Sequence, residues 1–218
     1  MIDAVVFDMD GVIVDSEQVW DDVRQIYTRE AGGTFTEAAT RAMMGMSSPE
    51  WSRYMSESLG VPGTPEEINA DIVERMLVRY GEEPPLIPGA VDAVRRIATR
   101  WPLAIASSSN PELIEVVLRA AGLDSLFRTT VSSQEVARGK PAPEVYLEAA
   151  RRLGVEPGRC AAVEDSHAGI RSAKAAGMLV LAVPNPHFPP DDEALAQADV
   201  VLGSIAELQP ESIAALES

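Results

Sequence analysis

From about residue 90 onward, short apolar runs alternate with longer segments whose apolar residues recur at helical spacing, and this alternation constrains the fold most. A first strand is expected at residues 5–7. Later strands are expected at 103–107, 129–132, 160–163, 179–183 and 200–202, and helices at 90–99, 111–121, 143–153, 167–176 and near the C-terminus. Strands that alternate with helices pair in parallel within one sheet, and the helices cover both faces. The sequence therefore predicts an α/β fold with a doubly wound parallel sheet.

The segment between the first strand and this alternating region carries no strand signal. Helices are expected at 17–31, 37–44, 49–59 and 65–80, followed by a linker rich in glycine and proline at 81–89. We therefore expect a core domain of residues 1–15 and 83–218 and an all-helical cap domain of residues 16–82. An insertion at this edge of a sheet is well placed to act as a lid, with hinges near 14–16 and 82–88.

The first strand runs directly into two carboxylates, Asp8 and Asp10, followed by Gly11. Ligands bind beyond the carboxyl ends of parallel strands, and strand periodicity places Asp8 and Asp10 on one side. Such close carboxylates repel each other unless a cation or a proton intervenes. The pattern also occurs in calcium loops and turns, but the apolar residues 12–14 provide no further oxygen ligands. We therefore expect a metal-assisted site in which one carboxylate attacks and the other handles a proton.

Three further strand ends carry polar residues that suit a phosphate or a metal ion. A serine-rich run from Ser107 leads to Asn110 at an expected helix start, which suits an anion or simply caps the helix. Lys140 lies in a loop and can neutralise a phosphate, although a solvated surface lysine is the alternative. Glu164 and Asp165 offer the oxygen ligands that Mg²⁺ prefers, or they cap the next helix.

The composition excludes several classes of partner. A net charge of −16 opposes binding to nucleic-acid backbones and to anionic membrane surfaces. No apolar run is long enough to span a membrane, and no secretory signal is evident. The single cysteine, Cys160, cannot form an intrachain disulfide and is expected in the core, at a strand start. We expect a cytoplasmic monomer whose partner is a small molecule, with no nucleic acid and no membrane.

Taken together in chain order, these motifs resemble the haloacid dehalogenase superfamily, in the branch with a helical cap inserted after the first strand. The four family motifs match Asp8 to Val12, Ser107, Lys140 and the Glu164-Asp165 pair. The resemblance covers essentially the whole chain and is strongest to phosphatases and phosphomutases related to β-phosphoglucomutase. It implies a Rossmann-like core beside the cap.

The resemblance also implies a chemical mechanism. Asp8 is expected to be the nucleophile that forms an aspartyl-phosphate. Asp10 is expected to protonate the leaving oxygen and then to deprotonate the attacking water. The implied cofactor is Mg²⁺, held by Asp8, the backbone carbonyl of Asp10 and Asp165, with Glu164 acting directly or through a water.

The resemblance assigns binding of the phosphoryl oxygens to Lys140 and Ser107, assisted by backbone N–H groups near Met9, Asp10 and Ser108. Specificity is expected to come from the cap. Its candidates for contacting the leaving group are Trp20, Met43, Met44, Gly45, Met46, Ser47, Ser48 and Trp51, although most of the apolar ones are expected to form the core of the cap instead. The loop from Gly45 to Ser48 is the favoured contact, because glycine permits close approach and serine offers hydrogen bonds.

A phosphatase acting on a small phosphorylated metabolite, most simply a sugar phosphate, is the favoured function. A phosphomutase is the alternative. β-Phosphoglucomutases that resemble this chain carry a histidine where it has Trp20, and an arginine where it has Pro49, with Arg53 nearest. Both departures favour the phosphatase.

Other activities of the superfamily fit less well. A dehalogenase typically lacks the second aspartate, Asp10, and a phosphonate hydrolase needs a cap lysine, which residues 16–89 do not contain. A regulator that binds a phosphorylated ligand on the same scaffold is a third possibility, because fold does not fix function.

Overall fold

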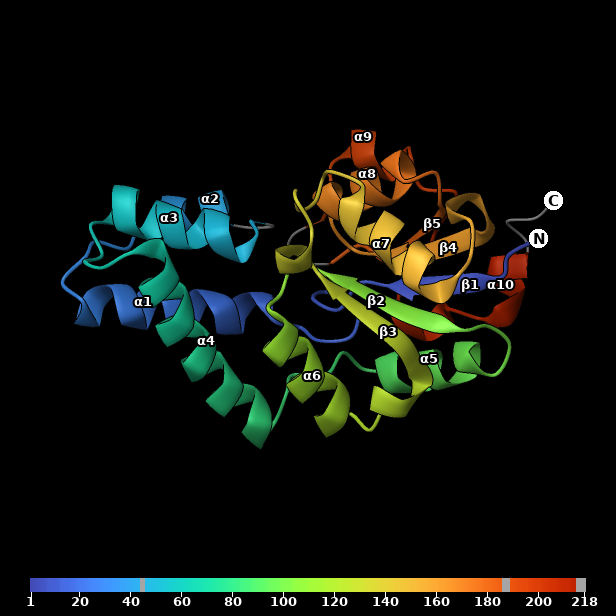
Figure 1. Cartoon of the computed structure of the whole chain (residues 1–218), viewed down its shortest axis with the longest axis horizontal. Coiled ribbons are helices and arrows are strands. Elements are labelled where there is room, and N and C mark those ends of the chain that lie inside the picture. The colour runs from blue at the N-terminus through green and yellow to red at the C-terminus, as the bar shows by residue number, and fades with distance from the viewer. Residues whose placement is uncertain (44–45, 186–188, 215–218) are drawn as a thin grey trace.

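The chain forms a parallel six-stranded sheet with helices on both faces, seen in a computed structural model that describes residues 1–43, 46–185 and 189–214 (Figure 1). The strand order is β3-β2-β1-β4-β5-β6, and every neighbouring pair is parallel. The strands are β1 (Ala4–Phe7), β2 (Leu103–Ser107), β3 (Phe127–Ser132), β4 (Cys160–Glu164), β5 (Leu179–Ala182) and β6 (Val200–Val201). The predicted doubly wound α/β fold is confirmed.

The helices follow the expected order, with ends that shift by one or two residues. The first four are α1 (Glu17–Glu30), α2 (Glu37–Met43), α3 (Ser48–Leu59) and α4 (Pro65–Glu82). The others are α5 (Ala90–Ala98), α6 (Pro111–Ala120), α7 (Glu144–Leu153), α8 (His167–Ala175), α9 (Asp192–Leu195) and α10 (Pro210–Ala214). The short helix α9 is an addition, because a four-residue helix is too short to show a periodic pattern. No helix in the described part of the chain is long and apolar enough to cross a membrane.

Both faces of the sheet are buried because side chains alternate between them along each strand. Val5 and Phe7 belong to the core that α5 and α6 cover, whereas Ala4 and Val6 belong to the core under α7 and α8. Figure 1 shows these two helix layers on opposite sides of the strands. Cys160 is buried at the start of β4, as predicted.

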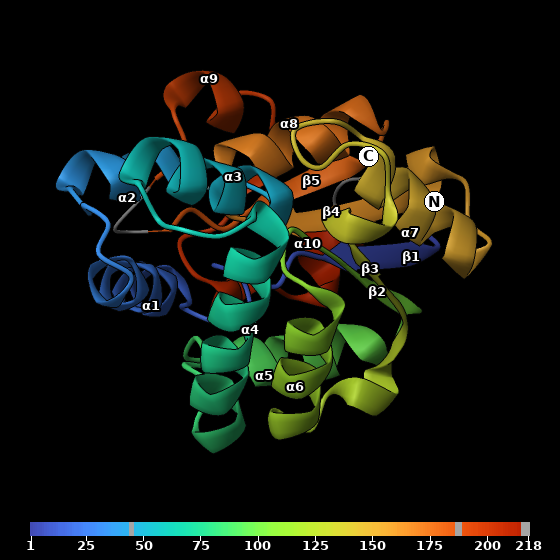
Figure 2. The ribbon, with the colours of Figure 1, turned by 60° about the vertical axis from the view of Figure 1, so that its left-hand side comes forward.

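Helices α1–α4, which we call the helical insertion, lie beyond the carboxyl ends of the strands, with α4 packed along α6 (Figures 1 and 2). The chain enters and leaves the insertion side by side. Val14 and Leu86 form an isolated β-bridge, and the Asp15 N–H donates to the carbonyl of Pro85. Because both connections lie at one point, they are suitably placed for the predicted hinges. The division into core and cap domains stays a prediction.

The central strand β1 and its neighbour β4 mark the point where the strand order changes direction. In open α/β sheets, ligands bind in the crevice beyond the strand ends at such a point. Asp8 directly follows β1, and Glu164 is the last residue of β4. The fold therefore places the two acidic motifs beside each other.

Candidate active site

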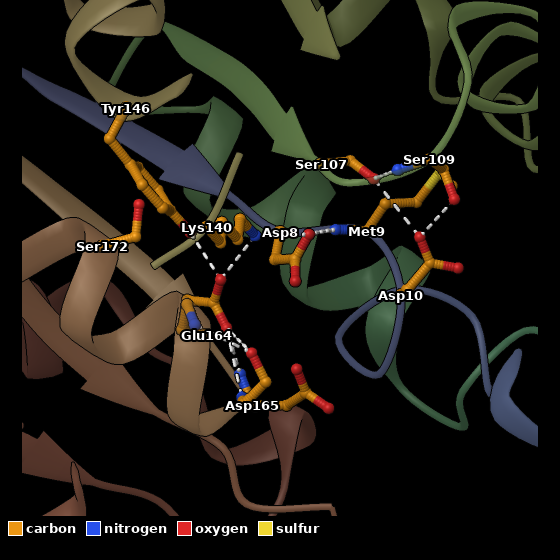
Figure 3. A network of polar contacts seen from close by, with 12 residues as sticks. Asp8, Met9, Asp10, Ser107, Ser109, Lys140, Tyr146, Glu164, Asp165 and Ser172 are labelled. Atoms are coloured by element: carbon orange, nitrogen blue, oxygen red, sulfur yellow. Dashed lines mark hydrogen bonds and ion pairs between the residues drawn. The ribbon is translucent and has the colours of Figure 1, made fainter. Parts of the chain in front are cut away.

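Three carboxylates meet at this crevice. Asp8, Glu164 and Asp165 are all buried, and each offers an oxygen within 4.8 Å of the others. Figure 3 shows them side by side, with Asp10 further along the loop after β1. The predicted acidic residues are thus brought together, except that the Asp10 carboxylate lies apart from this group.

Lys140 provides the positive charge in this cluster. Its Nζ lies 3.0 Å from Asp8 Oδ1 and 2.6 Å from Glu164 Oε1. The lysine is 7% exposed, and burial alone would lower its pKa. The carboxylates of Asp8 and Glu164 outweigh that effect and raise the pKa of Lys140, so the ammonium group stays charged.

The Glu164 carboxylate is saturated by hydrogen bonds. Its Oε1 accepts from Lys140 and from the Tyr146 hydroxyl, at 2.6 and 2.7 Å. Its Oε2 accepts from the N–H groups of Asp165 and Ser166 and from the Ser166 hydroxyl. Burial raises the pKa of Glu164, but Lys140 and these donors hold it below its usual value. A carboxylate offers about four lone-pair sites, so Glu164 has little capacity left for a direct metal bond.

Asp8 and Asp165, in contrast, keep oxygens free. Asp8 Oδ1 accepts from Lys140 and from the Met9 N–H at 2.7 Å, whereas Oδ2 accepts no hydrogen bond from the described residues. The Asp165 carboxylate likewise accepts none from that part of the chain. Burial, with added repulsion from Glu164, raises the pKa values of both Asp8 and Asp165 well above the usual range. A bound divalent cation would favour the ionised forms of both, and it would balance the two negative charges that three ionised carboxylates leave beyond the charge of Lys140.

Two glycines make this close packing possible. A Cβ on Gly11, which has a φ of +79°, would lie 1.8 Å from Asp165 Oδ2. A Cβ on Gly169, in the first turn of α8, would lie 1.7 Å from Glu164 Oε1. Each glycine therefore leaves the space that an acidic side chain occupies. The sequence showed Gly11 as part of a motif but gave no sign of the steric need at Gly169.

Asp10 is held by three serine hydroxyls. Ser16 donates to Oδ1 at 2.6 Å, and Ser107 and Ser109 donate to Oδ2 at 3.3 and 2.7 Å. Ser107 is fully buried, and its oxygen also accepts from the Ser109 N–H. In this structure Ser107 therefore contacts Asp10, while Ser108 is the serine of this run that opens toward the crevice. Sequence reasoning did not identify Ser16 or Ser109 as partners of Asp10.

Two cavities meet at Asp10 and Ser108. The larger, about 360 Å³, is lined by Asp8, Asp10, Glu17, Ser108, Lys140, Asp165, Ser166, His167, Ala168, Asn185, Pro189, Pro190 and Asp191. The smaller, about 70 Å³, is lined by Asp10, Ser16, Glu17, Trp20, Arg24, Met43, Met46, Ser48, Trp51, Ser108 and Ser109. The larger cavity lies on the acidic cluster and the smaller one lies against the helical insertion.

A family model described as "Hydrolase: haloacid dehalogenase-like hydrolase" matches residues 2–177. The chain belongs to this family. Among curated relatives, a "Probable pseudouridine-5'-phosphatase" of Drosophila melanogaster is 34% identical and covers 94% of the chain and 91% of its own length. "Hexitol phosphatase B" of Escherichia coli (strain K12) is 32% identical, covering 94% and 93%. The expected superfamily and the expected hydrolase class are confirmed.

Solved structures agree with this assignment. CbbY from Rhodobacter sphaeroides, in complex with phosphate, superposes with a TM-score of 0.85 at 29% identity, covering 95% of this chain and 96% of its own. β-Phosphoglucomutase from Clostridium difficile gives a TM-score of 0.82 at 21% identity, over 99% and 97% of the two chains. The second likeness establishes a shared fold only.

The predicted specificity residues of this hydrolase are divided by the structure. Trp20, Met46 and Ser48 line the smaller cavity, and Ser48 also donates to Asn110 Oδ1 at 2.6 Å. Ser47 instead caps α3, because its N–H and its hydroxyl both donate to Glu50. The predicted contacts Met44 and Gly45 lie outside the described residues. Met43 and Trp51, the other two candidates, also line the smaller cavity.

Proposed function

We propose that the protein is a Mg²⁺-dependent phosphatase that hydrolyses a small phosphorylated metabolite through an aspartyl-phosphate on Asp8. One observation carries the proposal: Asp8 Oδ2 is free beside a buried lysine and a free buried carboxylate, at a cavity of about 360 Å³. The curated relatives are named as phosphatases of hexitols, of pseudouridine 5'-phosphate and of phosphorylated carbohydrates, which supports this class of substrate.

The residues supply each step of the transfer. Asp8 Oδ2 attacks phosphorus, the bond from phosphorus to the leaving oxygen breaks, and Asp10 gives that oxygen a proton. Asp10 then takes a proton from the water that attacks the aspartyl-phosphate, which restores Asp8 and releases inorganic phosphate. Asp10 lines both cavities, so it lies at the boundary between the phosphoryl group and the leaving group.

The metal and phosphate contacts follow from which atoms are free. Asp8 and Asp165 would hold Mg²⁺, which supplies the positive charge that lets an anionic carboxylate approach an anionic phosphoryl group. Lys140 would bind a phosphoryl oxygen while Glu164 fixes its position. The Met9 N–H already donates to Asp8, so the backbone N–H groups of Asp10 and Ser108 are the better phosphate donors. Ser107 contributes by orienting Asp10.

We further propose that the helical insertion is a cap over this site. Its residues complete the smaller cavity, and the two segments that connect it to the sheet form a β-bridge between Val14 and Leu86. Closure would exclude bulk water and complete the leaving-group site. Trp20 occupies the position at which a phosphomutase is expected to carry a histidine. Among the described residues, no histidine lines the smaller cavity. This favours hydrolysis over phosphomutase chemistry.

The test is phosphate release from a panel of sugar, polyol and nucleoside phosphates, measured with Mg²⁺ and with EDTA. We expect release from one group of esters only when Mg²⁺ is present, and its loss in Asp8→Asn. Asp92→Asn, the same change at an exposed position of α5, is the matched control and should keep full activity. Normal turnover by Asp8→Asn, or by the enzyme in EDTA, would contradict the proposal. Conversion of β-glucose 1-phosphate to glucose 6-phosphate without release would indicate the mutase.

A further inference from the structure

Arg24, in the middle of α1, has an unusual environment for a charged side chain. It is only 8% exposed, and its guanidinium carbon lies 4.7 Å from the centre of the Trp20 ring and 5.0 Å from that of Trp51. The two tryptophans are themselves buried and in contact, with ring centres 5.9 Å apart. Contact with both rings attracts the cation and restricts the conformations that the Arg24 side chain can adopt.

The guanidinium group nevertheless lacks polar partners. It forms no hydrogen bond and no ion pair with any described residue, and its Nε is fully buried without a partner. Burial lowers the pKa of Arg24 to about 10, so the group remains charged at neutral pH. A buried charge without a hydrogen-bonded counter-ion is costly, and proteins rarely retain one unless a ligand completes it.

Arg24 lines the smaller cavity, which it shares with Asp10 and Ser108. These two residues also line the larger cavity where the phosphoryl group would bind. The smaller cavity is therefore where a leaving group would extend from the scissile oxygen. Its volume of about 70 Å³ accommodates a few water molecules, or a short leaving group of similar size.

The other charges at this cavity belong to Asp10 and Glu17. Asp10 accepts hydrogen bonds from three serines, and Glu17 forms no ion pair with Arg24 among the interactions of the described residues. Glu17, Asp21 and Asp10 lie near enough to favour the charged form of Arg24. They leave its donors without an acceptor, which a bound molecule could supply.

We propose that Arg24 determines specificity by binding an anionic oxygen on the leaving group of the substrate. This inference rests on the proposed phosphatase function and narrows its substrates to short phosphate esters that carry a second acidic group, a carboxylate or a second phosphate. A planar guanidinium donates two parallel hydrogen bonds to either group, which a neutral hydroxyl cannot match.

The test compares matched esters. 3-Phosphoglycerate carries a carboxylate where glycerol 3-phosphate carries a neutral hydroxymethyl group. A third ester, 1,3-propanediol bisphosphate, carries a second phosphate instead. We expect kcat/KM to favour an acidic ester, and Arg24→Met to lower that preference about tenfold to 100-fold, mainly through KM, as expected for hydrogen bonds to charged groups. The acidic ester for which Arg24→Met loses the kcat/KM advantage shows whether the anionic oxygen belongs to a carboxylate or to a second phosphate. Arg24→Lys, which retains the charge without the planar donors, should give an intermediate preference.

Arg75→Met is the matched control. Arg75 also stacks on an aromatic ring, that of Tyr27, but it pairs with Glu30 on the outer surface of the insertion. This variant should leave the preference unchanged. A wild-type preference for the neutral ester, or an equal loss toward all esters in Arg24→Met, would overturn the proposal and indicate a structural role for Arg24.

Binding separates this inference from the proposed function. Calorimetry with Asp8→Asn measures the affinity for 3-phosphoglycerate without turnover, and the same measurement follows in Asp8→Asn combined with Arg24→Met. If no ester is hydrolysed by the wild type, the phosphatase proposal fails, whereas a tenfold weaker affinity without Arg24 still supports the acidic-ligand site. Equal affinities would overturn it.

Discussion

Removal of the Tyr146 hydroxyl tests whether the hydrogen bonds to Glu164 stabilise the buried charges and hold Lys140 in position. Tyr146 is fully buried, and its hydroxyl donates to Glu164 Oε1 at 2.7 Å. Burial, with Glu164 and Asp8 nearby, raises the pKa of Tyr146 well above its usual value, so the hydroxyl remains a donor. A hydrogen bond to a charged group contributes about 1.5–3 kcal/mol, and Tyr146→Phe should lower the free energy of unfolding by about that amount.

Tyr80→Phe is a matched control in the same chain. Tyr80 is also fully buried, but its hydroxyl forms no hydrogen bond with the described residues. Ser16 lies near enough to affect the pKa of Tyr80, but its hydroxyl donates to Asp10 instead. Removing an unpaired buried hydroxyl should change stability by less than about 0.5 kcal/mol, or increase it.

Urea unfolding followed by tryptophan fluorescence gives both values. The stability loss in Tyr146→Phe corresponds to a fall of about 3–12 °C in Tm for a protein of this size. Phosphate release should also fall about tenfold, because Glu164 then holds Lys140 less firmly. Equal effects of the two substitutions on stability, or full activity in Tyr146→Phe, would refute the view that this hydroxyl supports the buried charges.

Three further perturbations follow from the same geometry. Gly169→Ala should lower phosphate release at least about 100-fold, because its Cβ would occupy the place of the Glu164 carboxylate. The control is Gly81→Ala, which has open space around it and should retain activity and gain up to about 1 kcal/mol of stability. Asp165→Asn should weaken Mg²⁺ binding at least about tenfold by calorimetry, and equal affinity would exclude Asp165 as a ligand. Burial raises the pKa of Cys160 to about 11 from 9.0, so iodoacetamide at pH 8 should modify it about 100-fold more slowly than a free thiol; rapid modification of the folded protein would contradict its burial.

The fold was predictable because its signals are periodic. Alternating apolar strands and amphipathic helices fix a parallel sheet, and the carboxyl ends of parallel strands lie at one edge. For this reason Asp8, Lys140 and Asp165 were expected to meet although more than 150 residues separate the first from the last. Element ends shifted because hydrogen bonds set them, and periodicity does not.

The partners within the site were harder to predict. Tyr146 follows the helical pattern of an ordinary core residue in α7, and only the packing of α7 over β1, β2 and β3 brings the hydroxyl to Glu164. Ser16 and Ser109 carry no signal that they meet at Asp10. In the sequence Arg24 resembles any other arginine on a helix, and its position over two tryptophan rings depends on the contact between Trp20 of α1 and Trp51 of α3. Such contacts depend on side-chain packing between distant segments, which no local pattern encodes.

The central claim is that Asp8 becomes covalently phosphorylated, and trapping that intermediate tests it most directly. The enzyme is mixed with Mg²⁺ and a phosphate ester that it hydrolyses. The reaction is quenched in acid within the first turnover, and the protein is digested for mass spectrometry. We predict a phosphoryl group on the peptide that contains Asp8, absent when EDTA replaces Mg²⁺ and absent in Asp8→Asn. Phosphate release without any modified Asp8 peptide at early times would contradict the mechanism and indicate direct attack by water.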